Sequence, residues 1–308
     1  MDVFSPKERL LRVLRREGAD RPPVICPGGM MNAAIVEVME KNGGASAAAL
    51  PAAHHEGGLM GDLARDVCEQ TGFENFGLPF CMTIEAEALG SEVDYGSLTC
   101  EPKIRREVFS SVGEVREQPP GAIAKNRRAE AVINAVHRLS RQFPDIPVIG
   151  SLTGPLSAAA SIVDPMTFLK ELRREKAAAH RVLDYVSDQL IDYVKLVAEN
   201  GASAISIADP TATGEILGPK LFGEYAVPCI NRIVDAVHAL GLPVIVHICG
   251  ELRMVQARLS GLRGDTLSVD AFVNLGSLKK EAGIENTMGN LSTYMLEFGS
   301  PERVRDAV

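Results

Sequence analysis

The chain is organised around one stretch, Val244-Ile245-Val246-His247-Ile248-Cys249-Gly250-Glu251. A β-branched run leads to an imidazole and a thiol two residues apart, and a glycine then lets the backbone turn away. Along a strand the side chains at i and i+2 point to the same side, so His247 and Cys249 can converge on one ion. Zinc prefers such nitrogen and sulfur ligands, but a site with an open position needs a third protein ligand. A buried strand with a hydrogen-bonded histidine and a packed cysteine explains the same pattern, so the surroundings must decide.

Strand and helix patterns alternate on both sides of this stretch. Short apolar segments typical of strands begin at about residues 24, 73, 148, 203, 244, 265 and 285. Helical patterns fill the intervals, among them those at about residues 30–42, 57–71, 125–142 and 175–200. Connections of this length fit right-handed βαβ units, which build a parallel sheet.

The number of strands predicts the fold. The capped sequence Ser5-Pro6-Lys7-Glu8 predicts a helix before the first strand, and residues of about 85–118 predict an excursion with some strand pairing. Seven strands are one fewer than a (β/α)₈ barrel contains. We therefore predict one α/β domain over residues 1–308, a TIM (β/α)₈ barrel truncated before its eighth strand. An open doubly wound sheet also accommodates seven strands, but no Gly-x-Gly-x-x-Gly follows the first one.

The composition limits the classes of function. The 308 residues are 46% hydrophobic and 23% charged, with a formal net charge of −8. An acidic chain repels polyanions, which argues against nucleic acid as a partner and against substrates with many carboxylates. The six cysteines are scattered and no secretion signal is visible, so we expect a cytoplasmic protein without disulfides. The apolar runs are too short to cross a bilayer, so we expect no membrane role.

Polar residues follow most of the predicted strands. The catalytic groups of a barrel come from the carboxyl ends of several strands, which meet at one rim. Besides His247 and Cys249, the candidates at this rim are Asp209, Asp270 and Asn290. Each of the three also has a structural explanation as a turn or cap residue, but their convergence on one rim favours a site.

Two other pairs of residues have open interpretations. Glu85 and Glu87 are a possible acid and base, although their i, i+2 spacing in an excursion strand is equally typical of a solvated face. His54 and His55 have no ligand partner at zinc spacing and lie in a glycine-rich loop, so we predict that both are exposed.

Several motifs resemble one known family. The run Asn75-Phe76-Gly77-Leu78-Pro79-Phe80-Cys81-Met82-Thr83-Ile84-Glu85-Ala86-Glu87-Ala88-Leu89-Gly90 is similar to the methylcobalamin:coenzyme M methyltransferases, which belong to the uroporphyrinogen decarboxylase superfamily. Further stretches follow in family order: Pro6-Lys7-Glu8-Arg9-Leu10, Asp20-Arg21-Pro22-Pro23-Val24, Ile205-Ser206-Ile207-Ala208-Asp209-Pro210, His247-Ile248-Cys249-Gly250 and Met288-Gly289-Asn290-Leu291-Ser292.

The resemblance implies a barrel that takes a methyl group from methylcobalamin on a partner corrinoid protein and gives it to a small acceptor. It also implies a zinc ion, held by His-x-Cys and a more distant cysteine, that binds the acceptor thiol and lowers its pKa. His247 and Cys249 match the first two zinc ligands. The third belongs to a Gly-Cys after the eighth strand, and no cysteine follows Cys249. We therefore expect a C-terminal truncation; an acidic ligand, a water ligand or the absence of zinc are the alternatives.

The resemblance leaves the identity of the methyl acceptor open. A related branch of the family methylates tetrahydrofolate without zinc, and in that case Asp209, Asp270 and Asn290 are the expected contacts of the pterin. Glu85 and Glu87 are further candidates for substrate binding. The intact His-x-Cys favours the zinc-activated thiol.

Two more functions are alternatives. Uroporphyrinogen decarboxylase is disfavoured, because its arginine-rich N-terminal signature is replaced by Ile25-Cys26-Pro27-Gly28-Gly29-Met30. The non-enzymatic alternative is a catalytically dead partner of the corrinoid protein.

Overall fold

A computed structural model describes residues 3–28, 50–98 and 100–307 of the chain. The helix expected at about 30–42 lies outside these residues. The strands form a parallel sheet in the order β1-β4-β5-β6-β7-β8. Its strands are β1 (Phe76–Leu78), β4 (Val148–Thr153), β5 (Ala204–Ala208), β6 (Val244–Ile248), β7 (Thr266–Val269) and β8 (Thr287–Met288).

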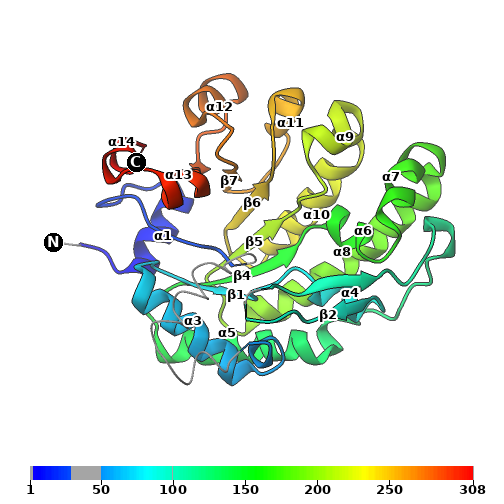
Figure 1. Cartoon of the computed structure of the whole chain (residues 1–308), viewed down its shortest axis with the longest axis horizontal. Coiled ribbons are helices and arrows are strands. Elements are labelled where there is room, and N and C mark those ends of the chain that lie inside the picture. The colour runs from blue at the N-terminus through cyan, green and yellow to red at the C-terminus, as the bar shows by residue number, and fades with distance from the viewer. Residues whose placement is uncertain (1–2, 29–49, 99, 308) are drawn as a thin grey trace.

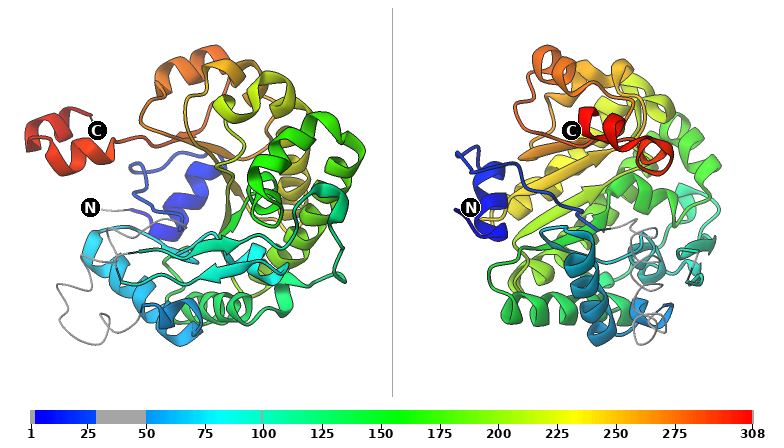
Figure 2. Two further views of the ribbon diagram at one scale, coloured as in Figure 1. Left: turned by 45° about the vertical axis from the view of Figure 1, so that its right-hand side comes forward. Right: turned by 60° about the vertical axis from the view of Figure 1, so that its left-hand side comes forward.

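Helices surround the outer face of this curved sheet (Figures 1 and 2). They begin and end near the positions that the periodic patterns predict, as α3, α5 and α8 show. The α-helices are α1 (Pro6–Leu14), α3 (Gly57–Thr71), α4 (Ile84–Ala88), α5 (Arg127–Gln142), α6 (Pro155–Ala160), α7 (Pro165–Arg174), α8 (Lys176–Glu199), α9 (Gly214–Leu221), α10 (Val227–His238), α11 (Gln256–Leu259), α12 (Leu275–Ala282), α13 (Thr293–Phe298) and α14 (Pro301–Ala307). Short 3₁₀ or π turns are η1 (Ala52–His54), η2 (Val112–Glu114), η3 (Ile123–Lys125), η4 (Phe222–Ala226) and η5 (Arg253–Val255).

Successive side chains of a strand point to opposite faces of the sheet, and so belong to two different apolar clusters. In β6, Val244, Val246 and Ile248 pack with the outer helices, whereas Ile245 belongs to a second, inner cluster. His247 therefore points to the inner side, because side chains two residues apart share a face. In register beside it are Ala208 of β5 and Ser268 of β7.

Helix α1 packs against the inner cluster near the amino-terminal ends of the strands. Leu10 and Leu14 contact the cluster formed by Ile149, Ala204 and Ile245, and all five side chains are buried. Proline at the first turn and the Ser5 hydroxyl, which accepts from the amide of Glu8, begin this helix as predicted. One opening of the sheet is thus covered by the N-terminal helix, and the opposite rim holds the carboxyl ends of the strands.

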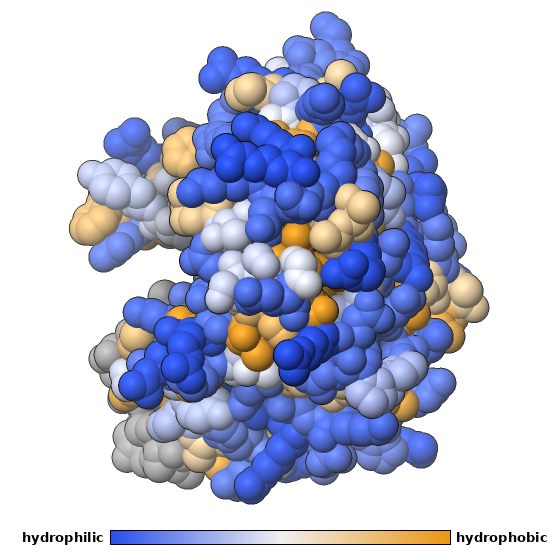
Figure 3. Space-filling model, turned by 90° about the vertical axis from the view of Figure 1, so that its right-hand side faces the viewer, coloured by the Kyte–Doolittle hydropathy of each residue, from blue (hydrophilic) through white to orange (hydrophobic). Residues whose placement is uncertain are grey.

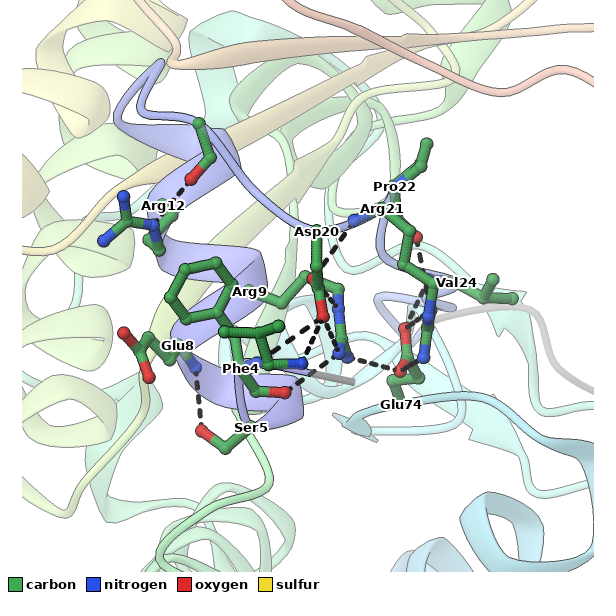
Figure 4. Close-up of polar contacts among 12 residues, drawn as sticks. Phe4, Ser5, Glu8, Arg9, Arg12, Asp20, Arg21, Pro22, Val24 and Glu74 are labelled. Atoms are coloured by element: carbon green, nitrogen blue, oxygen red, sulfur yellow. Dashed lines mark hydrogen bonds and ion pairs between the residues drawn. The ribbon is translucent and has the colours of Figure 1, made fainter. Parts of the chain in front are cut away.

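A buried arginine attaches α1 to the sheet (Figure 4). Arg9 is fully buried, and it donates to both carboxylate oxygens of Asp20 and to Oε1 of Glu74, just before β1. The bond from Arg9 holds the pKa of Asp20 well below its usual range. A buried guanidinium needs such partners, since an unpaired buried charge is costly.

The prediction of a strand that begins at about residue 24 is wrong. Residues 22–27 form no regular strand. Instead they run beside β1, where the Glu74 amide donates to the Val24 carbonyl and the Asn75 side chain bonds to both the amide and the carbonyl of Cys26. Two prolines at 22 and 23 and a third at 27 remove the donors that a regular ladder requires. The described sheet therefore has six strands, not seven.

The segment 85–118 contains a hairpin of β2 (Glu92–Asp94) and β3 (Lys103–Arg106), paired antiparallel. The strand predicted to begin at about residue 73 is short, because β1 starts at Phe76 and ends at Leu78, and Ile84 already begins α4. Among the described residues no helix is long and apolar enough to span a membrane. The face shown in Figure 3 is mostly hydrophilic, with apolar residues in small groups.

Candidate metal and acceptor site

His247 and Cys249 meet at the carboxyl end of β6. His247 is the fourth residue of the strand, and Cys249 follows its last residue. Nε2 of His247 lies 3.1 Å from Sγ of Cys249. The i, i+2 geometry predicted from the sequence therefore brings the two side chains together.

Asp270 is the third member of this group. It directly follows β7, and its Oδ1 lies 3.8 Å from Nε2 of His247. Its other carboxylate oxygen, Oδ2, accepts from the backbone amide of Gly250 at 2.6 Å. This bond links the turn after β6 to the turn after β7.

Ser268 orients the imidazole from the neighbouring strand. Its Oγ lies 3.0 Å from Nδ1 of His247, its register partner. A ligand histidine in metalloproteins is commonly held through its second ring nitrogen in this way. Our reading of the sequence missed Ser268, although the alternation that connects His247 to Cys249 also places Ser268 on the side of Asp270.

Burial and charge set the protonation of the group. Burial lowers the pKa of His247, opposed in part by the charge of Asp270 and by a hydrogen bond with the backbone of Ser268. Burial, with the charges of Asp270 and Asp209, raises the pKa of the Cys249 thiol to about 11. The imidazole is thus neutral and able to bind a metal, whereas the thiol keeps its proton at neutral pH unless a cation is bound nearby.

The donor set fits zinc. One imidazole nitrogen, one sulfur and one carboxylate oxygen all lie within 4.8 Å of one another, and they are the only such group among the described residues. Zinc binds these three ligand types and keeps an open fourth position in catalytic sites. His247, Cys249 and Asp270 can therefore hold zinc and leave room for one acceptor atom.

Asn290 lies beside this group but bonds to the backbone. Its side-chain Nδ2 donates to the Asp270 carbonyl at 2.8 Å and also to the Val273 carbonyl. These bonds hold the turn that carries Asp270. The proposed contact of Asn290 with a substrate ring stays a prediction.

Asp209 caps a neighbouring helix. It is fully buried, and its carboxylate accepts from the amides of Leu156 and Ser157 and from the Ser157 hydroxyl, at 2.6 to 3.0 Å. The residue before α6 is Gly154, where a Cβ would lie 2.4 Å from the Cβ of Asp209. Gly154 has no side chain that could cap the helix. Because it also lacks a Cβ, Asp209 has the room to approach and to cap the helix instead. Burial raises the pKa of Asp209, against these hydrogen bonds.

The expectation that Glu85 and Glu87 lie on an excursion strand is wrong, because both are on helix α4. Glu85 is buried and accepts from the amide and the hydroxyl of Thr153, at the end of β4. Burial raises the pKa of Glu85. Among the described residues, no hydrogen bond or ion pair joins either glutamate to His247 or Cys249.

Glu87 belongs to a buried network around Arg128, which our reading of the sequence did not identify. Arg128 donates to Glu87 at 2.7 Å and to Sγ of Cys81 at 2.9 Å, and the Tyr95 hydroxyl donates to Glu87 at 2.6 Å. Arg128 also donates to the carbonyl of His54. The position of Arg128 in the first turn of α5 resembles that of an ordinary surface residue, so the sequence contains no signal for this network.

The prediction that His54 and His55 are both exposed is wrong. His54 is buried, and His55 is half-buried with its ring 4.4 Å from that of Tyr95. Burial, with the charges of Arg128 and His55, lowers the pKa of His54 to about 4. The tertiary contacts of the network, rather than the local glycines, determine this burial.

Comparisons with known proteins agree with the fold and the motifs. Residues 5–308 match the family model described as uroporphyrinogen decarboxylase (URO-D). The chain is 32% identical to the methylcobamide:CoM methyltransferase MtbA of Methanosarcina acetivorans, over 100% of this chain and 88% of the relative. It is 27% identical to MtaA of Methanosarcina barkeri, over 95% and 84%.

A solved structure supports the same assignment. A methyltransferase from Methanosarcina mazei superposes with a TM-score of 0.88 and 25% identity, covering 98% of this chain and 88% of that one. The chain therefore belongs to the uroporphyrinogen decarboxylase superfamily and, within it, to the corrinoid-dependent methyltransferase family that includes the methylcobamide:CoM methyltransferases.

Proposed function

We propose that this protein transfers a methyl group from a methylated corrinoid, carried by a partner protein, to a small thiol of the coenzyme M type. The observation that carries the proposal is the convergence of His247 Nε2 and Cys249 Sγ at the rim of the barrel, 3.1 Å apart. Relatives over nearly the whole chain bear the name methylcobamide:CoM methyltransferase, which supports the same acceptor.

The chain's own residues prepare a zinc site in this proposal. Ser268 holds Nδ1 of His247, so that Nε2 is directed to the ion. Cys249 would bind the metal as a thiolate, whereas without a cation its thiol, with a pKa of about 11, keeps its proton at neutral pH. When bound, zinc supplies the Lewis acidity that keeps an acceptor thiol deprotonated and nucleophilic at neutral pH.

The polar residues near the site favour a thiol over tetrahydrofolate. A pterin needs carboxylate and amide groups that are available for its ring. The carboxylate of Asp209 already caps α6, and the side-chain nitrogen of Asn290 already bonds to two backbone carbonyls. His247 and Cys249, in contrast, face each other in the geometry of a soft metal site.

The test combines metal analysis with demethylation of methylcobalamin in the presence of coenzyme M, homocysteine or tetrahydrofolate. We expect stoichiometric zinc, activity with a thiol, and loss of both in His247→Ala. His137→Ala is the control, because His137 is exposed on α5 and should retain zinc and activity.

The other functions give different results. Activity with tetrahydrofolate alone, in a protein that binds no zinc, would replace our proposal with the folate branch. Turnover of uroporphyrinogen would indicate the decarboxylase. Tight binding of a corrinoid protein without turnover of any acceptor would indicate a catalytically dead partner.

A further inference from the structure

We propose that the surface formed by α7 and α9 is the docking site for an acidic face of the partner protein that carries the methylated corrinoid. This inference rests on the proposed function and adds to it the surface where the methyl donor binds. The two helices lie next to each other on the side of the molecule away from both termini (Figure 1). Five cations form what we call the basic surface: Lys170, Arg173 and Arg174 on α7, Lys176 at the start of α8, and Lys220 in the last turn of α9.

The positive charge of the basic surface is available to a partner, because all five side chains are exposed. Lys176 pairs with Glu224 at 2.6 Å, whereas the other four cations form no ion pair with any residue that the structure describes. Of the acidic residues on the same stretch, Glu171 accepts from the amide of Val112, and Glu175 lies at the junction of α7 and α8. A local excess of cations on a chain with a net charge of −8 attracts a complementary, acidic surface and steers its approach.

The basic surface contains two adjoining hollows that suit the side chains of a protein. The first, of about 440 Å³, is lined by Arg173, Lys176 and Lys220. The second, of about 270 Å³, shares Arg173 with the first and is lined by two exposed apolar side chains, Met166 and Ile216. Arginine and methionine are both enriched in protein interfaces, whereas a pocket for a small anion has a few convergent polar groups in a concave, mostly enclosed site. The composition therefore favours a protein face as the occupant.

Helix α9 connects the basic surface to the proposed acceptor site. It begins against the turn after β6, where a Cβ added at Gly250 would lie 3.1 Å from Oε2 of Glu215. From this first turn, beside Cys249, the helix continues through Ile216 to Lys220. Since α7 and α9 follow β4 and β5 along the chain, both belong to the carboxyl-end rim. A protein bound across them would have its edge beside Cys249, where methyl transfer requires the corrinoid.

A second copy of this chain fits the basic surface less well. Most homodimers have twofold symmetry, so each subunit presents the same patch to the other. A symmetric dimer through α7 and α9 would bring two sets of the same cations together, and like charges across an interface cost free energy. An acidic face of a different protein has no such cost.

The test compares two methyl donors, because only one of them has a protein face. The corrinoid proteins of the same organism, each purified and loaded with methylcobalamin, are the protein-bound donors, and free methylcobalamin is the small donor. Coenzyme M is the acceptor in both assays. The variant is the double substitution Arg173→Glu/Lys220→Glu, in the last turns of α7 and α9.

The matched control is Arg15→Glu/Arg141→Glu, which changes the net charge by the same amount. Both arginines are exposed and lie at the ends of their helices, Arg15 after α1 and Arg141 in the last turn of α5. Helix α1 covers the amino-terminal opening of the sheet, and α5 ends just before β4 begins. The control therefore changes charge at the opposite end of the barrel.

We expect Arg173→Glu/Lys220→Glu to raise KM for the protein-bound donor by about 10- to 100-fold. Turnover of free methylcobalamin should stay at the wild-type level, which also shows that the variant is folded. The wild-type KM for the protein-bound donor should rise between about 0.05 M and about 0.5 M salt, because salt screens the attraction, and the KM of the variant should not. The control should stay within about twofold of the wild type with both donors, since its charges lie more than a Debye length from the rim.

The outcomes separate the docking surface from the proposed function. An unchanged KM for the protein-bound donor in the variant, or an equal increase in the control, would overturn the docking surface, while turnover of free methylcobalamin would leave the proposed function intact. Use of free methylcobalamin without calorimetric binding of any of the corrinoid proteins would overturn the partner. Wild-type dimers that the variant loses would assign the surface to a second copy and so overturn it as well. A wild type that demethylates neither donor would overturn the proposed function itself, and calorimetric binding of the corrinoid proteins to the wild type and the variant would then decide on the surface alone.

Discussion

Oγ of Ser268 lies 3.0 Å from Nδ1 of His247, across the register pair that joins β7 to β6. A neutral imidazole with Nδ1 engaged in this way would present Nε2 to a zinc ion in the proposed site, and the bond also fixes the ring plane. The serine hydroxyl has no contact with Cys249 among the hydrogen bonds of the described residues. Its effect on zinc binding in the proposed site would therefore be indirect, through the orientation of the histidine.

We predict that Ser268→Ala weakens zinc binding by about 10- to 100-fold, the usual effect of losing an outer-shell partner. The fold should be retained, because alanine fits a buried strand position. Zinc affinity from chelator competition checks this. Ser268→Thr, which keeps the hydroxyl on a β-branched side chain, should restore most of the affinity. An affinity in Ser268→Ala equal to that of the wild type would show that Nδ1 needs no partner.

We predict that Asp209→Asn destabilises the protein by about 1–3 kcal/mol, because an amide group would face one of the three donors that now bind the carboxylate. The free energy of unfolding from urea titration measures this. Asp164→Asn is the control, since Asp164 caps α7 through Thr167 and asparagine is an equally good cap. Unchanged stability together with a large increase in KM for the acceptor would instead support the role in substrate binding predicted from the sequence.

We predict that Glu87→Gln destabilises the fold by about 2–3 kcal/mol, somewhat less than the full cost of breaking a buried pair. Arg128 has 1% of its side chain exposed and Glu87 has 19%, so the loss of the carboxylate leaves a buried cation with a weaker partner. Denaturant unfolding tests this. Glu92→Gln removes an exposed pair with Arg106 and should cost about 0–1 kcal/mol. A loss of acceptor binding without a loss of stability would point to a substrate contact.

The sequence predicted the parts of the structure that depend on local patterns. The β-branched run that ends in His247 is a strand, and the i, i+2 rule brings His247 and Cys249 together. The polar residue that follows the next strand, Asp270, was likewise predicted near His247, because parallel strands end at one rim. These features require only the alternation of side chains and the order of the strands.

Other features depend on contacts between distant segments. Glu87 was predicted on a strand, but it lies on α4 and bonds to Arg128, 41 residues later. Asp209 has the residue type of a site acid, and only its hydrogen bonds from Leu156 and Ser157, 52 to 53 residues away in the chain, show that it caps α6. A sequence pattern cannot distinguish a carboxylate that points to a cavity from one that points to a helix N-terminus.

The irregular segment beside β1 gives a prediction about Gly77. A Cβ at this position would lie 2.6 Å from the Cys26 carbonyl oxygen and 2.6 Å from the Gly28 amide nitrogen, both backbone atoms. Gly77→Ala should therefore destabilise the protein by about 1–3 kcal/mol or more, because the backbone of either segment must move. Gly18→Ala is the control, as no atom in the described part of the chain lies within 4 Å of a Cβ added at this position. Equal thermal stability of the two variants would mean that residues 26–28 do not pack against β1.

His54 makes the stability depend on pH. Its pKa falls from 6.5 to about 4 in the folded protein, through burial and then the charges of Arg128 and His55. Between these two values the unfolded chain binds more protons than the folded one, so the stabilisation present above pH 6.5 is lost as the pH falls toward 4. The full difference is on the order of 3 kcal/mol.

We therefore expect the free energy of unfolding to decrease between pH 7 and pH 4.5, roughly the window set by the two pKa values, and His54→Leu to reduce that decrease. Within residues 3–28, 50–98 and 100–307, Nδ1 of His54 has no hydrogen-bond partner, so an apolar side chain removes the titration without breaking a bond at that atom. Urea unfolding at several pH values measures the slope. His137→Leu, at an exposed position on α5, should keep the wild-type slope. If His54→Leu retains the whole pH dependence, other groups must cause it, and the buried neutral state of His54 contributes nothing to acid sensitivity.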